Sequence, residues 1–268
     1  MNNNLNAEEI REFYCWSRDY WDELSADADG TLSHVLNFGV WEKDTANLYA
    51  AQENFRQIIV ALLGDVSSDS HCFEIGCGIG GFAVKTAMDI KGHLHCLDLL
   101  SEHLELSASY ADEMNIAEKM TFYQGSAMQL SSFTDNSFDC AYCIESSFHY
   151  TDKEIFFREV YRVLKPGSIF VIADITCEDN SKITFKQGNF FPSSDEFTHY
   201  FNSAGFTSNQ YRSIGPQVFA PLLNFVRTYN QKNKLRNKLT KFWGRVLTNY
   251  SELCRAGLLD YKIYQLKK

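Results

Sequence analysis

The sequence predicts a doubly wound α/β protein, in which helices cover both faces of a mostly parallel sheet. Between His71 and Ile175, short apolar runs alternate with amphipathic stretches, which is typical of strands joined by crossover helices. A glycine-rich loop follows the first of these runs and precedes the first amphipathic stretch. The chain has 268 residues, of which 45% are hydrophobic, so we expect one large domain with elaborations.

The first part of the sequence is predicted to be helical. Apolar residues recur at helical spacing over residues 7–24 and again over residues 45–63. We expect residues 1–64 to form an N-terminal helical cap, or lid, on the sheet. Several aromatic residues of the first helix are expected either to line the lid or to pack on the core: Phe13, Tyr14, Trp16, Tyr20 and Trp21.

Residues 65–215 are expected to contain the core of the sheet and its helices. Apolar runs predict strands at residues 71–75, 93–98, 120–124, 138–145 and 168–175. Amphipathic stretches between them predict helices at residues 81–90, 101–115 and 152–164. The third of these helices is closed by Pro166 and Gly167, which do not continue a helix. A further helix at 194–204 and a strand at 208–214 are expected in the same part of the chain.

Residues 216–268 are predicted to contain a basic amphipathic helical segment and a final strand at 259–266. No Asp or Glu occurs between Phe197 and Ser251, whereas eight Lys or Arg residues do. On one continuous helix, five basic side chains lie within about 40° of one line: Arg227, Lys234, Lys238, Lys241 and Arg245. This face is either a solvated helix surface or a binding surface for an anionic substrate, an acidic carrier domain or an anionic membrane.

Composition and charge exclude several classes of protein. A formal net charge of −9 argues against nucleic-acid binding. No apolar run approaches the roughly 20 residues of a membrane span, and residues 1–9 lack the pattern of a secretory signal. We therefore expect a cytoplasmic location, with the eight cysteines reduced. Cys140 and Cys143 point to opposite faces of one strand, so no metal site is expected.

The glycine loop is the strongest local motif. Its glycines at positions 76, 78, 80 and 81 fit both the dinucleotide pattern G-x-G-x-x-G and the G-x-G-x-G pattern of ligands without a pyrophosphate. Glu74, just before the loop, would repel a pyrophosphate but can receive an ammonium group. Asp98 ends the next strand, where a carboxylate accepts hydrogen bonds from ribose hydroxyls. S-adenosyl-L-methionine, a nucleoside with a positively charged amino-acid tail, satisfies both carboxylates.

Several motifs within residues 37–175 together resemble the class I S-adenosylmethionine-dependent methyltransferases. They are the loop at 74–80, Asp98, the turn Gly125-Ser126-Ala127-Met128, the strand opening Ser137-Phe138-Asp139 and the segment Arg162-Val-Leu-Lys-Pro-Gly167. The segment Asn37-Phe-Gly-Val-Trp41 is similar to one in the small-molecule group, which includes tocopherol, phosphoethanolamine and sugar O-methyltransferases. The resemblance implies a Rossmann-like, seven-stranded sheet with its last strand antiparallel, and S-adenosyl-L-methionine as the cofactor of residues 65–215.

The resemblance also assigns residues to this cofactor. It implies that Gly76 and Gly78 approach the methionine part, Asp98 the ribose and residues 126–128 the adenine. Ser126 stands where the family usually has Asp, so its hydrogen bond to the adenine is weaker or is made by the backbone. The full set of expected cofactor contacts is Trp41, Glu74, Gly76, Cys77, Gly78, Asp98, Leu99, Ser126, Ala127, Met128, Ile144 and Glu145.

A histidine is the expected catalytic base. His149 follows the fourth strand, at the carboxyl edge of the sheet where ligands bind, and an imidazole can remove the proton of a hydroxyl nucleophile. Asp174, near the end of the fifth strand, is expected to orient the imidazole. In the sugar methyltransferases that the sequence resembles, a His and an Asp at these positions are thought to form the acid/base pair. The alternative is that His149 only shapes the pocket while Asp174 caps a turn.

The predicted function is methyl transfer to a small molecule, anionic or hydrophobic, most simply at a hydroxyl oxygen. N- or C-methylation stays open, and Glu145 and Tyr150 would then serve a carbon nucleophile. A nicotinamide (NAD)-dependent oxidoreductase is an alternative of another class, because the glycine pattern permits it. A second alternative is a non-catalytic subunit that binds the cofactor. The acceptor and the oligomeric state stay open at this point.

Overall fold

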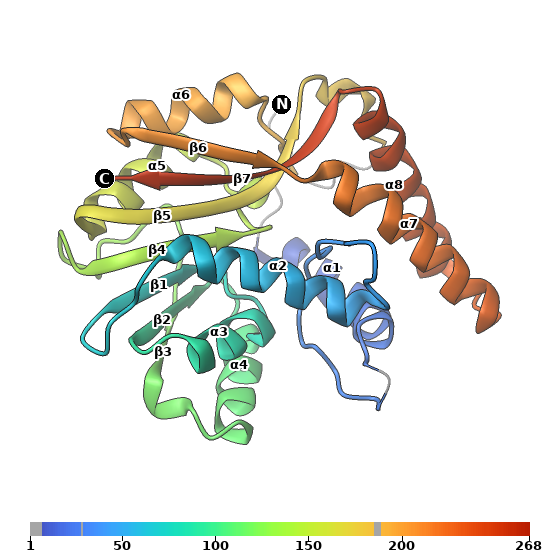
Figure 1. The fold of residues 1–268 in the computed structure, drawn as a ribbon, viewed down its shortest axis with the longest axis horizontal. Coiled ribbons are helices and arrows are strands. Elements are labelled where there is room, and N and C mark those ends of the chain that lie inside the picture. Colours follow the sequence, from blue (N-terminus) through green and yellow to red (C-terminus); the bar gives the residue numbers. More distant parts are fainter. Residues whose placement is uncertain (1–6, 28, 185–188) are drawn as a thin grey trace.

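The chain folds around one seven-stranded sheet with the strand order β3-β2-β1-β4-β5-β7-β6 (Figure 1). The computed structural model describes residues 7–27, 29–184 and 189–268. Strands β1 to β5 run parallel, and β7 is antiparallel to β5 and β6. The expected doubly wound sheet with an antiparallel last strand is confirmed. The strands are β1 (His71–Ile75), β2 (His93–Asp98), β3 (Met120–Gln124), β4 (Phe138–Ile144), β5 (Leu164–Cys177), β6 (Ser208–Ser213) and β7 (Leu259–Lys267).

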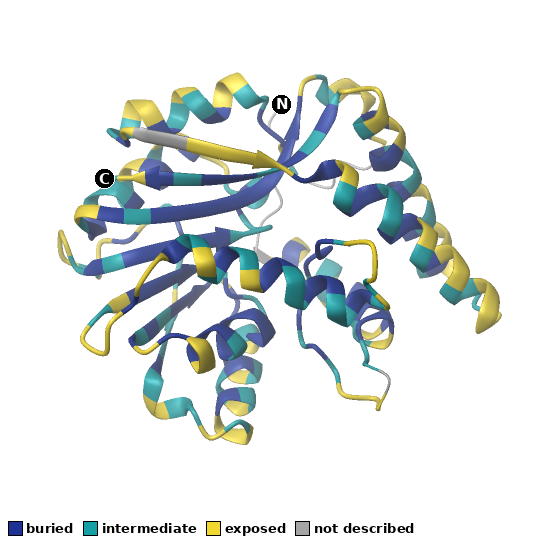
Figure 2. Cartoon of the chain, in the orientation of Figure 1, coloured by how far each residue is buried: buried dark blue, intermediate teal, exposed yellow. Residues whose placement is uncertain are grey.

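Helices cover both faces of the sheet. Neighbouring strand residues point to opposite faces, so Cys72 and Phe73 belong to two different hydrophobic clusters. Helices α5 and α6 pack on one face, and α1 to α4, α7 and α8 contribute to the other. Figure 2 shows β4 and β5 buried along most of their length. The helices are α1 (Ala7–Leu24), α2 (Leu48–Leu63), α3 (Gly81–Asp89), α4 (Ser101–Glu113), α5 (Lys153–Val163), α6 (Ser194–Ala204), α7 (Gly215–Lys232) and α8 (Lys238–Arg255), with short 3-10 helices η1 (Ala117–Lys119), η2 (Ser147–His149) and η3 (Asn180–Lys182).

The predicted elements agree closely with the structure through the first five strands. Strands β1, β2 and β3 and helix α1 have the predicted bounds. Strand β5 is longer than expected, from Leu164 to Cys177, because it pairs with β7 as far as Cys177. Helix α2 begins later than expected, at Leu48, because Asn47 caps it by accepting a hydrogen bond from the N–H of Ala50 (2.8 Å). No described helix is long and apolar enough to cross a bilayer.

The placement of the five basic side chains of residues 216–268 on one continuous helix is wrong, because the segment folds into two helices, α7 and α8. Helix α7 begins at Gly215 and ends at Lys232. The chain then turns with a positive φ of 54° at Lys234. Asn237 starts α8 by accepting a hydrogen bond from the N–H of Thr240 at 2.9 Å. The basic side chains of this segment therefore come from two helices and the loop between them.

Pro221 lies inside α7 and leaves a carbonyl free for another partner. A proline has no N–H, so the carbonyl of Gln217, one turn earlier, lacks its helical donor. The backbone N–H of Trp41 donates to this carbonyl at 2.8 Å. The Trp41 ring also packs against Phe225 of α7, with 5.1 Å between ring centroids. These contacts fasten segment 37–41 to α7.

Two cysteines form a disulfide, which corrects the expectation that the cysteines are all reduced. Cys72 of β1 and Cys140 of β4 are register partners on adjacent strands, with Cα atoms 4.9 Å apart, a separation that disulfides commonly span. The two cysteines are 68 residues apart in the sequence, so only the strand order brings them together. Cys143 is a free thiol.

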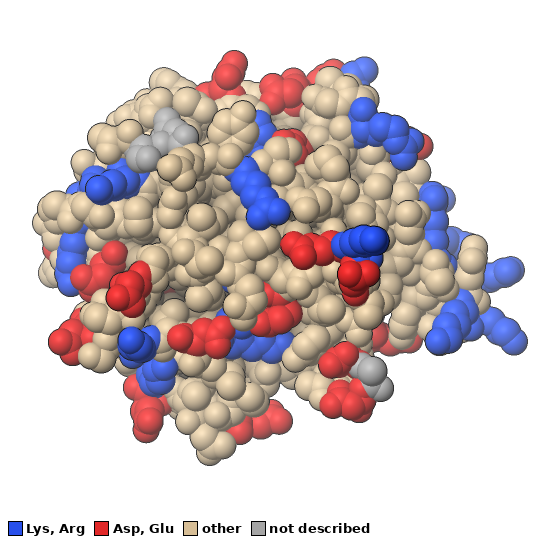
Figure 3. Space-filling view, in the orientation of Figure 1, with Lys and Arg blue, Asp and Glu red and all other residues tan. Residues whose placement is uncertain are grey.

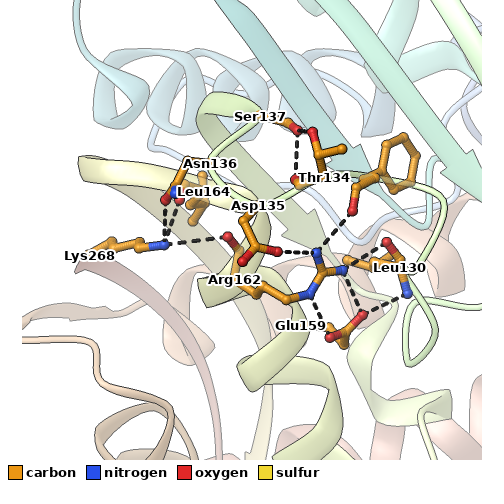
Figure 4. Close-up of polar contacts among 10 residues, drawn as sticks. Leu130, Thr134, Asp135, Asn136, Ser137, Glu159, Arg162, Leu164 and Lys268 are labelled. Atoms are coloured by element: carbon orange, nitrogen blue, oxygen red, sulfur yellow. Dashed lines mark hydrogen bonds and ion pairs between the residues drawn. The ribbon is translucent and has the colours of Figure 1, made fainter.

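Arg162 of α5 fastens the loop between β3 and β4 to the sheet domain (Figure 4). Its guanidinium donates to the carbonyls of Leu130 and Phe133, both at 2.9 Å. It also pairs with Asp135 (2.8 Å) and with Glu159 (2.9 Å), which lies one turn earlier on α5. Glu159 in turn accepts the N–H of Leu130 at 3.0 Å. The arginine of the motif at 162–167 therefore holds a loop.

We predict that Arg162→Ala lowers the free energy of unfolding by about 2–3 kcal/mol, because two loop carbonyls and two carboxylates lose their donor. Arg162→Lys should restore only part of this loss, since one ammonium cannot replace the planar fork. Denaturant unfolding measures both variants. The control is Arg158→Ala on the exposed side of the same helix, expected within about 0.5 kcal/mol of the parent. Equal losses for the two alanine variants would contradict this account.

Candidate functional site

A cavity of about 250 Å³ opens at the carboxyl ends of β1, β2 and β4. The strand order reverses between β1 and β4, and open α/β sheets bind ligands at such a reversal. The loop after β1, the end of β2 and the turn after β3 form one wall, and α1 and α8 form much of the other. Of the expected cofactor residues, all except Trp41 line this cavity.

The glycine loop requires bare backbone at Gly76. Its φ is 80°, and a Cβ there would overlap the hydroxyl of Ser146 and lie 2.7 Å from its Cβ. Gly78 also has a positive φ, 55°, but a Cβ there would meet no atom within 4 Å. The N–H groups of Gly76 and Cys77 donate to the Leu97 carbonyl at 2.8 and 3.0 Å, which fixes the loop on β2. The loop thus presents open backbone to the cavity at Gly78.

Asp98 organises this wall of the cavity. One carboxylate oxygen accepts the N–H of Gly78 at 2.8 Å. The other accepts the N–H of Leu100 at 3.0 Å and lies 3.1 Å from Nδ1 of His103. Asp98 is 9% exposed. A single buried carboxylate therefore joins the glycine loop to the first turn of α4.

Two further carboxylates, Glu74 and Glu145, face the cavity from deep positions. Glu74 accepts a hydrogen bond from the Tyr142 hydroxyl at 2.7 Å, and burial raises the pKa of its carboxyl to about 8. Glu145 accepts the N–H of Phe38 at 2.9 Å and the Tyr261 hydroxyl at 3.0 Å, and burial raises its pKa to about 8 as well. Buried carboxyl groups of this kind favour a cationic ligand, because a nearby positive charge stabilises their ionised form.

The wall opposite the glycine loop is mainly aromatic. Helix α1 contributes Phe13 and Trp21, segment 37–41 contributes Phe38, and α8 contributes Trp243 and Tyr250. The rings contact one another: Trp21 stacks on Phe38 at 5.7 Å, and Trp21 and Trp243 meet edge to face at 4.9 Å. Among the lining residues that the structure describes there is no Lys or Arg. This wall suits an apolar ligand and offers no cation to pair with an anionic one.

His149 ends the short helix η2 and faces the cavity from its floor. Its Nε2 lies 3.0 Å from the hydroxyl of Tyr14 on α1. Its Nδ1 is buried and has no hydrogen-bond partner among the described residues. Burial lowers the pKa of the imidazole to about 4, so the ring is neutral near pH 7. A neutral ring with one unsatisfied nitrogen is suited to receive a ligand hydroxyl.

The expected hydrogen bond between Asp174 and the His149 ring is absent, so that prediction is corrected. Asp174 does not line the cavity. Its carboxylate accepts the Ser147 hydroxyl and the N–H groups of Phe148 (3.2 Å) and Ile175 (2.8 Å). Burial raises its pKa to about 6. Asp174 therefore holds the backbone turn that carries His149 and does not contact the imidazole.

Trp41 is the second correction, since it does not line the cavity. Its indole N–H donates to the Phe38 carbonyl at 3.2 Å, and its ring lies on α7 as described above. The motif that contains Trp41 is nevertheless part of the site, because its Phe38 and Asn37 face the cavity. Trp41 anchors the segment that carries them.

Tyr14 and His103 also line the cavity. The sequence predicts only that Tyr14 lines the lid or packs on the core, and it predicts no role for His103. The Tyr14 ring meets the rings of His103 and His149 edge to face, at 5.5 and 5.9 Å. Nothing in the local pattern separates Tyr14 from the other aromatic residues of α1. The signal for His103 is its position in the first turn of the helix after Asp98, from which a side chain reaches back to the strand end.

We predict that Gly76→Ala and Gly78→Ala differ sharply in stability. Each places a Cβ at positive φ, which costs about 1–2 kcal/mol. Only the Gly76 variant also collides with Ser146, which adds about 1–3 kcal/mol of overpacking. Denaturant unfolding of the two variants, which act as controls for each other, measures the difference. Equal stability of the two would show that Ser146 gives way freely.

Comparison with known proteins identifies the domain. A family model described as a methyltransferase domain matches residues 73–172. The chain is 32% identical over 134 residues to the sterol 24-C-methyltransferase erg-4 of Neurospora crassa, a match that covers 50% of this chain and 35% of that enzyme. It is 26% identical over 249 residues to the methyltransferase GfsG of Streptomyces halstedii, covering 84% and 87% of the two chains. The chain thus spans about a third of the fungal relative's length.

A solved structure shows the same fold over the whole chain. The cyclopropane synthase MmaA2 from Mycobacterium tuberculosis superposes with a TM-score of 0.81 at 17% identity, over 99% of each chain. Its fold therefore includes the helices outside residues 73–172. These matches identify residues 73–172 as a methyltransferase domain, and the glycine loop and the acidic end of β2, which lie in it, fit S-adenosyl-L-methionine as its cofactor.

Proposed function

We propose that this chain transfers a methyl group from S-adenosyl-L-methionine to a hydroxyl oxygen of a largely apolar small molecule. The division of the cavity into two sides carries this proposal. Three carboxylates and bare glycine backbone lie at the strand ends, whereas aromatic side chains gather around His149. The first side suits a cationic cofactor, and the second suits an apolar acceptor.

The described residues fit the cofactor. We assign its amino-acid part to the loop at Gly76 and Gly78, its ribose to Asp98 and its adenine to the turn at 126–128. Bound there, it supplies a methyl group on a positively charged sulfur. The Asp98 oxygen that accepts the Gly78 N–H has no second hydrogen-bond partner among the described residues and keeps a lone pair for a ribose hydroxyl. Glu74 supplies negative charge beside the loop.

His149 is assigned as the base that receives the proton of the acceptor hydroxyl. When Nε2–H donates to the Tyr14 oxygen, the lone pair of Nδ1 is free for this proton. As the acceptor oxygen bonds to the methyl carbon, the bond from that carbon to the cofactor sulfur would break and leave a neutral thioether, while the hydroxyl proton passes to Nδ1 and the imidazole becomes positively charged. Asp98 stabilises that charge, because its carboxylate favours the protonated form of the ring. Tyr14 and the Asp174-bound turn hold the ring in place, which is the positioning that methyl transfer needs.

C-methylation of a lipid-like molecule is the second candidate, and Glu145 favours it. A carbon nucleophile such as an alkene develops positive charge as it accepts the methyl group. The carboxyl group of Glu145 and the aromatic faces around it would stabilise that cation. The cavity gives no support to an anionic acceptor, since the described lining residues include no Lys or Arg. Mass spectrometry and NMR of the product separate O- from N- and C-methylation.

Cofactor titration tests the proposal. By calorimetry, S-adenosylmethionine and S-adenosylhomocysteine should bind at micromolar concentrations and NADH should not. Asp98→Ala should abolish binding of both adenosyl ligands, because it removes the ribose acceptor and releases the Gly78 N–H. Asp112→Ala, on the exposed side of α4, is the matched control and should bind normally. Binding of NADH alone would overturn the proposal and restore the nicotinamide alternative.

We predict that His149→Ala lowers turnover at least tenfold while cofactor affinity stays near that of the parent chain, because a positioned base contributes about 10²-fold or more. Turnover of the parent should be constant above about pH 5 and fall as pH drops through the His149 pKa of about 4, where Nδ1 becomes protonated. Methyl-label transfer to a candidate acceptor measures the turnover of the variant and the pH dependence of the parent. His199→Ala, on the exposed side of α6, is the control. Unchanged turnover in His149→Ala would remove this residue from the mechanism.

A further inference from the structure

Helices α7 and α8 and the loop between them carry a concentrated positive charge. Between Gly215 and Arg255 the chain has eight Lys or Arg residues and one acidic residue, Glu252. This contrasts with the net charge of −9 for the whole chain. Figure 3 shows basic side chains gathered at the right-hand edge, where Figure 1 places the far ends of the two helices. The charge of the molecule is therefore strongly asymmetric.

One face of α8 carries three of these basic side chains. At about 100° per residue, Lys238, Lys241 and Arg245 lie within about 60° of one another. Arg227 of α7 extends the same face, since its guanidinium donates to the Thr248 hydroxyl of α8 at 3.0 Å. We call these four residues the basic face. Basic side chains of α7 and α8 therefore share one face, whereas the sequence predicted such a face on a single helix.

The side chains of the basic face form no ion pair in the part of the chain that the structure describes. All four side chains are exposed, and none of the ion pairs found among the described residues includes one of them. The loop adds further exposed cations at Lys232, Lys234 and Arg236. Uncompensated like charges repel one another, so an anionic partner gains favourable interaction with all of them at once.

An aromatic edge borders the basic face. Phe242 lies one helical position from Lys241, and its ring meets Trp16 of α1 edge to face at 5.1 Å. Trp16 is 43% exposed, which is unusual for so large an apolar side chain. Trp243, the next residue, lines the cavity. One side of α8 therefore faces solvent with cations and an aromatic edge, while another side forms the wall of the proposed acceptor site.

We propose that the basic face docks on a membrane that contains anionic lipid. Cations that flank exposed aromatic side chains are the pattern of helices that lie at a lipid–water interface. This pattern favours a bilayer over a soluble acidic protein, which would need no aromatic edge. The reason for docking rests on the proposed function. An apolar acceptor partitions into lipid, and docking through α8 would bring the cavity close to that lipid. Glu12 and Asp19 flank Trp16 on α1, and their negative charge would repel anionic lipid. We therefore place the membrane contact on α8 and on the loop between α7 and α8.

Vesicle sedimentation tests this proposal without cofactor or acceptor, so its outcome is independent of the methyl-transfer assay. Vesicles of phosphatidylcholine with phosphatidylglycerol should bind the full chain at low salt, and vesicles of phosphatidylcholine alone should bind it at least tenfold more weakly. Charge reversal in the combined variant Lys238→Glu, Lys241→Glu and Arg245→Glu should weaken binding at least tenfold. The matched control reverses three exposed cations elsewhere, Lys43→Glu, Lys91→Glu and Arg158→Glu, and should bind like the parent.

Circular dichroism and the affinity for S-adenosylhomocysteine report whether each variant keeps its fold, because none of the substituted residues lines the cavity. Equal binding to the two kinds of vesicle would overturn the proposal, as would equal weakening by the two triple variants. Binding to soluble polyglutamate, with no binding to anionic vesicles, would also overturn it and assign the basic face to an acidic protein.

Discussion

The carboxylate of Asp98 connects the parts of the site to one another. It holds the glycine loop through Gly78 and the start of α4 through Leu100 and His103. The His103 ring then touches Tyr14, and Tyr14 reaches His149. A continuous set of contacts thus runs from the end of β2 to the aromatic side of the cavity and passes through α1. The cap is consequently part of the site, and its position depends on a strand end in the sheet.

The sequence predicts those features of the structure that depend on residues close together in the chain. The strand bounds follow from apolar runs, and the ligand side of the site follows from Glu74, the glycines and Asp98, which lie within one β-α-β unit. The contacts that the sequence did not reveal join distant segments. Tyr14 meets His149, Cys72 meets Cys140, and Asp174 bonds the turn before His149 instead of its ring. In each case the partner depends on the strand order or on the position of the N-terminal helices. The periodicity of a helix or strand cannot predict such a partner.

Burial gives the cavity an unusual electrostatic character. Glu74 and Glu145 have pKa values raised to about 8, so both are largely protonated at neutral pH when no cation is near. A positively charged ligand shifts this balance toward carboxylates. The protonation of Glu74 and Glu145 therefore depends on whether a cationic ligand lies beside them.

The carbonyl that Pro221 leaves without a helical donor in α7 couples two segments that are far apart in the chain. Because Trp41 occupies that carbonyl, and its ring rests on Phe225, the segment after α1 and the α7–α8 hairpin are mutually fitted surfaces. Both segments also contribute residues to the aromatic wall of the cavity. Recombination that replaced one of them alone would leave an unpaired backbone group and a mismatched ring contact. The segment at 37–41 and the α7–α8 pair are therefore structurally coupled, although most of the sheet lies between them in the chain.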